Sequence, residues 1–307
     1  MDQPGLSGDT DPFQSAPGLG CMIRGLVAFG QNPMASAMRL LTRAGVAVAV
    51  TIGLAGCFTI PVENPSFPAT SREIDADLAR MEREPVRLER PVIVLSGYRS
   101  PHPVASRLAE RLRELTGAER QEMQSLAYIW SGTVEEPARK AVARVEELWP
   151  SDDPDWTTEV DVVAISMGGL VARLAAADSE MRGEPGGKRL RIGTLYTLAS
   201  PHRGARLAKT IRLDSAGRSM HPGSAFLAQL DDVFADRDYE VVPYAVLRDT
   251  WVGARHAAPV GQEPIWVPGR VMLSHHLVSF NRRIHADLAR RLRGEEALGK
   301  SGEPPSE

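Results

Sequence analysis

The chain has 307 residues, of which 43% are hydrophobic and 24% charged, and its formal net charge is −3. This length allows one large domain or two small ones, and the charge gives no support for a nucleic-acid partner, which usually meets a clustered basic face. The seven histidines are too scattered to indicate a metal site. Even the adjacent His275 and His276 point in different directions. We therefore expect no metal ion, and the chemistry described below needs no cofactor.

Residues 38–57 carry the features of an export signal. Two arginines precede an apolar run that is too short to span a membrane. The run ends in Leu-Ala-Gly-Cys, which resembles the bacterial lipobox, in which the cysteine thiol is acylated and becomes the mature N-terminus. The resemblance implies a signal peptide over 38–56, lipid attachment at Cys57, and a location in the bacterial cell envelope on the periplasmic or outer-membrane side. A buried helix with a chance cysteine is the alternative.

Residues 1–37 are rich in glycine and proline and stand before this signal. Because an export signal normally opens a chain, we expect translation to start at Met34 or Met38, and residues 1–37 to be an over-extended, disordered start. Cleavage before Cys57 would also remove Cys21, so the mature chain is expected to have no disulfide.

The pattern beyond Cys57 predicts a tether and then one domain. Three prolines over 58–72 and a helical pattern over 73–84 predict a tether with a short helix across 57–89. Apolar segments predict six strands, at 90–101, 122–130, 160–165, 189–201, 239–249 and 263–273. Amphipathic segments predict helices at 103–117, 134–150 and 277–294. This alternation indicates a mostly parallel sheet with helices on both faces, in one α/β domain over 90–294. The polar tail, 295–307, is expected to be disordered.

The segment "VDVVAISMGGLVAR", residues 160–173, predicts a strand, a sharp turn and a helix, with Ser166 at the turn. A nucleophile elbow holds its serine in this place, strained and with the hydroxyl exposed. The residues two before and two after the serine crowd together and must be small. Gly168 meets this demand, and Ala164 stands where glycine is usual. Taken by itself, the motif favours a serine that caps the following helix, so the catalytic interpretation depends on the rest of the chain.

Two backbone amides are candidates for an oxyanion hole. The helix after Ser166 would point its N-terminus at the site, which makes the N–H of Met167 one donor. The loop "VLSGYRSP" after the first strand would supply the second donor, the N–H of Tyr98, because Gly97 lets the backbone approach closely. A plain turn is an equally good interpretation of Ser96-Gly97 if the serine is ignored.

The catalytic acid and base are expected after the later strands, in the order serine, acid, histidine. The strand "VVPYAVLRD" ends on Asp249, and "VMLSHHLVSF" places His275 and His276 before the closing helix. A carboxylate would fix the imidazole tautomer and stabilise the cation that forms when the imidazole takes the serine proton. From their positions alone, either histidine could serve.

Together these segments resemble the bacterial lipases and esterases of the α/β-hydrolase fold, over about residues 90–294. "PVIVLSGY" is similar to their "V-x-V-H-G" segment, with Ser96 in place of the histidine, and "AISMGG" to "GHSMGG". "TLASPHRGA" is similar to "TLGTPHRGS", which is the most distinctive piece. The resemblance implies a minimal α/β-hydrolase fold. The family's spacing from the catalytic histidine to two core aliphatic residues selects His275, because it lands on Ile284 and Leu288.

The resemblance implies a membrane-anchored serine hydrolase that cleaves acyl or lipid esters through an acyl-enzyme. Ser166 would attack, His275 would act as general base and then acid, and Asp249 would orient it. A thioesterase, amidase or phospholipase with the same triad is an alternative, as is a non-catalytic lipoprotein with this fold. The segment 203–239 is a candidate cover for the pocket. Its apolar side chains fit an acyl site and a buried core equally well, namely Ala225, Phe226, Leu227 and Leu230.

Overall fold

The computed structural model describes residues 66–305, apart from 101, 129–130, 210–213 and 270–272. The described residues all belong to one compact unit, Pro61–Glu307. The predicted start, signal peptide and Cys57 lie outside the described residues. Within the described part of the chain, no helix is both long and apolar enough to cross a membrane.

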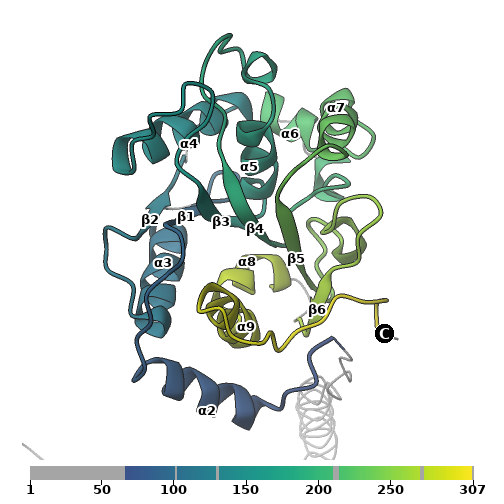
Figure 1. The fold of residues 1–307 in the computed structure, drawn as a ribbon. Coiled ribbons are helices and arrows are strands. Elements are labelled where there is room, and N and C mark those ends of the chain that lie inside the picture. The colour runs from purple at the N-terminus through teal and green to yellow at the C-terminus, as the bar shows by residue number, and fades with distance from the viewer. Residues whose placement is uncertain (1–65, 101, 129–130, 210–213, 270–272, 306–307) are drawn as a thin grey trace, which may run out of the picture. The chain divides into compact units, whose positions relative to one another are not determined.

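The centre of the domain is a sheet of six parallel strands (Figure 1). The strands are β1 (Val92–Leu95), β2 (Met123–Leu126), β3 (Val160–Ile165), β4 (Ile192–Leu198), β5 (Glu240–Val246) and β6 (Ile265–Val267). They lie in the order β2-β1-β3-β4-β5-β6, and every pairing between them is parallel. The six predicted segments each contain one strand, so the sheet forms as the apolar pattern indicates.

Helices cover both faces of the sheet, which is why β3 is buried along its whole length. One face carries α2 (Ser71–Met81), α3 (His102–Thr116) and α9 (Arg282–Leu292), and the other carries α4 (Glu135–Leu148), α5 (Gly168–Ala176) and α7 (Ala225–Phe234). The shorter helices are α6 (Ser215–Ser219) and α8 (Ser274–Leu277), with 3-10 turns at Ser179–Arg182, Leu207–Lys209, Ala254–His256 and Val278–Phe280. Strand residues alternate between the two cores: Val163 faces α3 and α9, whereas Val162 and Ala164 face α4 and α5.

Two predicted boundaries are wrong. One is the start of the folded domain, and the other is the start of its closing helix. Helix α2 belongs to the folded domain and not to a tether, because Ile74, Leu78 and Met81 are buried in the core beneath α9. The closing helix begins at Arg282 instead of 277. The side chain of Asn281 accepts a hydrogen bond from the Arg283 N–H and so starts a new helix there, after α8 and a 3-10 turn.

The prediction of a disordered tail is also wrong. The Asp287 carboxylate on α9 is fully buried and accepts hydrogen bonds from the backbone N–H groups of Leu298 (2.6 Å) and Gly299 (2.7 Å). The indole N–H of Trp266 donates to the Gly302 carbonyl, and Leu298 packs against the core. The composition of the tail does not predict this packing, because the segment is held mainly by hydrogen bonds of its backbone and not by apolar side chains.

We expect removal of residues 296–307 to lower the free energy of unfolding by about 3 kcal/mol or more. Two hydrogen bonds to a buried charged acceptor would be lost, at roughly 1.5–3 kcal/mol each. Urea unfolding of the shortened and full-length chains measures the difference. A chain that lacks only the last four residues is the control, since it keeps Leu298, Gly299 and Gly302. Equal stability of all three proteins would mean that the tail contributes nothing.

Candidate active site

Ser166 lies in the sharp turn between β3 and α5, with a φ of 51°. This left-handed conformation is strained for a residue with a side chain. It is held in place because the Ser166 N–H donates to the Leu198 carbonyl of the neighbouring strand β4 (2.9 Å). The turn lies at the carboxyl edge of the parallel sheet, where the loops after β1, β3 and β5 meet.

Small residues make this turn feasible. A Cβ added to Gly168 would lie 2.8 Å from the Ser96 carbonyl oxygen, and one added to Gly169 would lie 2.5 Å from Ser200 Oγ, so neither position has room for a side chain. Ala164, on the near side, is fully buried within the core under α4 and α5. Its methyl group is therefore accommodated within this core, and alanine serves where glycine is usual.

The structure brings Ser166, His275 and Asp249 into one hydrogen-bonded chain. The distance from Ser166 Oγ to His275 Nε2 is 3.0 Å, and the distance from His275 Nδ1 to Asp249 Oδ2 is 2.9 Å. The other carboxylate oxygen of Asp249 accepts from the N–H groups of Trp251 (2.8 Å) and Val252 (3.0 Å). Since a carboxylate only accepts, His275 Nδ1 carries the proton and Nε2 is free to accept the serine proton.

Two residues that the sequence analysis did not single out support His275. The hydroxyl of Ser274 donates to the Leu247 carbonyl (2.9 Å) and so fastens α8 to the end of β5, close to Asp249. The indole of Trp251 lies parallel to the His275 ring, with ring centroids 5.8 Å apart and an angle of 1° between the planes. A serine immediately before the histidine and an aromatic residue just after the acid were the available signals.

His276 has a different environment. Its ring is exposed and meets Trp251 edge-on, with ring centroids 4.5 Å apart. No hydrogen bond joins His276 to Ser166 or Asp249 in the described part of the chain. The geometry thus places His275 in the hydrogen-bonded chain and leaves His276 outside it, exposed at the rim of the site.

The two predicted oxyanion donors lie beside the serine. The N–H groups of Met167 and Tyr98 donate to no acceptor among the residues that the structure describes. A Cβ on Gly97 would be 3.2 Å from Ser166 Cβ, so the loop after β1 is in contact with the serine itself. Both amides are therefore available to an oxygen that binds at this point.

A cavity of about 430 Å³ opens onto Ser166 and His275. Most of its lining surface is apolar, and its apolar side chains include Val104, Ile165, Pro201, Leu207, Met220 and Val252. The segment 203–239 does border the cavity, but through Ala205, Leu207, Ala208, Gly217 and Met220. Leu227 and Leu230 are buried against α5 and belong to the core, so the core interpretation of those side chains is correct.

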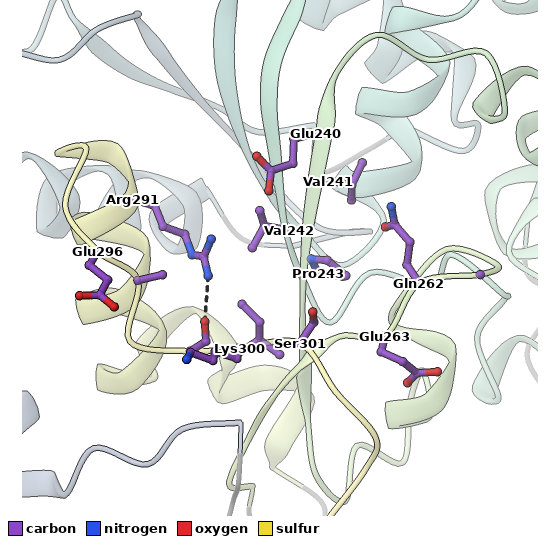
Figure 2. A pocket seen from close by; sticks show the side chains of 14 residues that line it. Glu240, Val241, Val242, Pro243, Gln262, Glu263, Arg291, Glu296, Lys300 and Ser301 are labelled. Atoms are coloured by element: carbon purple, nitrogen blue, oxygen red, sulfur yellow. Dashed lines mark hydrogen bonds between the residues drawn. The ribbon is translucent and has the colours of Figure 1, made fainter.

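A second cavity, of about 600 Å³, lies at the start of β5 beside the C-terminal tail (Figure 2). Its lining mixes acidic and basic side chains, including Glu240, Glu296, Arg291 and Lys300, and Arg291 donates to the Gly299 carbonyl across it (2.9 Å). This cavity is at the amino end of the strand and contains no residue of the hydrogen-bonded chain. In the described residues, no group of three histidine, cysteine, aspartate or glutamate side chains could hold a metal ion.

Comparisons with known proteins find likeness at the level of structure. No family model and no curated protein matches the chain. Among solved structures, phospholipase PlaB from Legionella pneumophila has 15% identity and a TM-score of 0.40, over 52% of this chain and 40% of its own. Mature lipase BlEst2 from Bacillus licheniformis has 13% identity and a TM-score of 0.44, over 62% and 88%. YbtT, a type II thioesterase of the yersiniabactin pathway, has 15% identity and a TM-score of 0.41, over 69% and 96%.

The fold class follows from the sheet itself. Six parallel strands in the order β2-β1-β3-β4-β5-β6, covered by helices on both faces and with a serine at the turn after β3, define a minimal α/β-hydrolase fold. The predicted fold class is therefore confirmed. This chain spans less than half of the length of the phospholipase chain.

Replacing Gly168 with alanine should destabilise the domain. Helix propensity alone would favour alanine by about 1 kcal/mol, but the new methyl group would press on the carbonyl oxygens of Ser96 and Leu95, 2.8 and 3.0 Å away. We expect a net loss of about 2 kcal/mol and a fall in Tm of roughly 5 °C in thermal unfolding. Gly302→Ala, which meets nothing within 4 Å, is the matched control. If Gly168→Ala is as stable as this control, the prediction is wrong and the loop after β1 can shift at little cost in free energy.

Proposed function

We propose that the protein is a serine hydrolase that cleaves carboxylic esters through an acyl-enzyme. The observation that carries the proposal is the hydrogen-bonded chain from Ser166 through His275 to Asp249, at the mouth of an apolar cavity. A serine hydroxyl is a weak nucleophile until a base removes its proton, and this geometry supplies a base with its tautomer already fixed.

The reaction begins when Ser166 Oγ attacks the acyl carbonyl carbon and its proton passes to His275 Nε2. The carbonyl oxygen becomes an oxyanion, which accepts hydrogen bonds from the N–H groups of Met167 and Tyr98 in this proposal. Collapse of the tetrahedral intermediate breaks the bond to the leaving alkoxide, which takes the proton from His275. Water then repeats the sequence on the acyl-enzyme and releases the carboxylic acid. Asp249 stabilises the imidazolium in both halves and stays ionised.

The cavity supports an acyl substrate. Its lining around Val104, Leu207 and Met220 offers apolar surface and few polar partners, which suits a hydrocarbon chain rather than a charged group. An ester is the linkage that the resemblance to lipases and esterases supports. Thioesters, amides and phospholipid esters are alternatives for the same machinery, and a non-catalytic protein with this fold is the alternative outcome of the test below.

Fluorophosphonate labelling of the purified domain tests the nucleophile. We expect wild type to be labelled, and Ser166→Ala not to be. His275→Ala should slow labelling by about a thousandfold or more, because the serine loses its base. His276→Ala is the matched control and should change the rate only a few-fold, since its ring lies at the rim. The catalytic proposal fails if wild type is not labelled or if Ser166→Ala is labelled equally. A series of p-nitrophenyl esters, with a thioester and an anilide of one acyl chain, then ranks the linkages.

We also propose that the mature protein is lipid-anchored through Cys57, on the support of the lipobox resemblance. A diacylated cysteine would hold a domain stably at a membrane, because each buried methylene contributes roughly 0.8 kcal/mol. Metabolic labelling with palmitate should mark the wild-type chain and fail in Cys57→Ala. Cys21→Ala is the matched control and should be labelled normally. Label that persists in Cys57→Ala would remove the anchor from the proposal.

A further inference from the structure

The loop that carries the Tyr98 amide has little support of its own. The Ser100 N–H donates to the Gly97 carbonyl at 3.3 Å, and the Ser96 N–H, at the start of the loop, donates to the Leu126 carbonyl of β2 (3.0 Å). Between them, the N–H groups of Gly97, Tyr98 and Arg99 donate to no acceptor in the described part of the chain. Arg99 adopts a left-handed φ of 49°, which is strained for a residue with a side chain. Such a conformation persists only where neighbouring groups impose it.

Asp214 supplies that support from a distant part of the chain. One carboxylate oxygen, Oδ2, accepts hydrogen bonds from the Tyr98 hydroxyl (2.6 Å) and from Arg99 Nη2 (2.9 Å). The other oxygen, Oδ1, accepts from the Gly217 N–H (2.8 Å) and so caps α6. A single carboxylate thus joins two consecutive side chains of the loop to a helix that begins more than a hundred residues later.

Helix α6, to which Asp214 joins the loop, is itself held in place. The Ala216 N–H of α6 donates to the carbonyl of Gly132 (2.8 Å), in the loop after β2, and the side chains of α6 that face inward are buried. The Ala205 N–H donates to the Met220 carbonyl at the end of α6 (2.8 Å), which ties the helix to the wall of the cavity. Asp214 therefore holds the loop against a fixed surface.

We propose that Asp214 is a positioning residue that sets the Tyr98 N–H at the distance from Ser166 needed to bind the oxyanion. The inference rests on the proposed function, since it assigns a role within that reaction. Asp214 acts through the Tyr98 and Arg99 side chains and touches no reacting atom. Because Gly97 packs directly on Ser166, a small rotation of the loop would displace the next amide, that of Tyr98, relative to the serine.

The protonation states suit this role. Partial burial works to raise the pKa of Asp214, but hydrogen bonds from Tyr98, the Gly217 N–H and Arg99 outweigh it and lower that pKa below its ordinary value. Burial, together with Asp214, raises the pKa of the Tyr98 phenol to about 12. At neutral pH the carboxylate is therefore ionised and the phenol keeps the proton that it donates.

The decisive substitution is Asp214→Asn. Asparagine caps a helix as well as aspartate does, so Oδ1 can still accept from Gly217, but the amide NH₂ cannot accept from Tyr98 or Arg99. Tyr98→Phe removes the phenol hydrogen bond from the other side. Asp178→Asn is the matched control, because Asp178 caps the 3-10 turn Ser179–Arg182, at the far end of α5 from Ser166.

The readout is binding of an alkylboronic acid alongside ester kinetics. Ser166 Oγ bonds to boron and its proton passes to His275, which gives a tetrahedral anion that resembles the intermediate. We expect Asp214→Asn and Tyr98→Phe each to weaken boronate binding about tenfold and to lower kcat/KM by a similar factor, with KM within about twofold, because the lost interaction belongs to the transition state. Asp178→Asn should match wild type, and all three variants should keep the wild-type Tm within a few degrees.

The outcomes separate the inference from the proposed function. One outcome is that wild type is labelled by fluorophosphonate, but Asp214→Asn and Tyr98→Phe bind boronate as wild type does. The role of Asp214 is then refuted and the serine hydrolase proposal stands. If wild type is not labelled, both fail together. Should Asp214→Asn prove unstable, Tyr98→Phe carries the test, since it removes only one hydroxyl group. A loss of kcat without a loss of boronate affinity in Tyr98→Phe would also overturn the assignment.

Discussion

The constraint on which the site depends is the left-handed turn at Ser166. Such a turn costs about 1–3 kcal/mol and persists only where its surroundings leave no alternative. Here the neighbouring strand β4 accepts the Ser166 N–H, and the loop after β1 crosses directly over Gly168. Both contacts follow from the register of the sheet, in which Ala164 is paired with Leu95 on one side and with Thr197 on the other. The sheet therefore fixes the position of Ser166, and the other groups of the candidate site are positioned relative to it.

Carboxylates that are buried or half-buried fix segments of the chain, and two of these segments carry groups of the candidate site. Asp249 binds the backbone N–H groups of Trp251 and Val252 through one oxygen and His275 through the other. Asp287 binds two backbone N–H groups of the C-terminal tail, and Asp214 binds one of α6. In each case a carboxylate accepts hydrogen bonds from backbone N–H groups, and hydrogen bonds to a carboxylate are stronger than those between neutral groups. These contacts order loops that the hydrophobic core does not reach.

This division explains what could be predicted from the sequence. The strands and main helices follow from apolar periodicity, and the positions of Ser166, Asp249 and the histidine pair follow from the strand order. The periodicity carries no information about hydrogen bonds to single carboxylates. For that reason the sequence predicts disorder for the tail beyond Asp287, which is in fact packed, and nothing in the pattern distinguishes Asp214 from other surface aspartates. The choice of His275 came from a family spacing, and its physical basis is the bond from Ser274 to the end of β5.

The loop after β1 departs from the lipase pattern, and the structure shows what holds it in place. Ser96 stands where the resemblance has a histidine, and its hydroxyl makes one long contact, 3.5 Å, with the Gly97 carbonyl. The loop is instead fastened from outside, because the Tyr128 hydroxyl donates to the Ser96 carbonyl and the Tyr98 hydroxyl donates to Asp214. Two phenols thus hold the backbone on either side of Gly97. A chain can lack the histidine of this motif and keep the geometry of the loop, provided that other side chains fix the same backbone. The motif alone does not reveal which side chains do so.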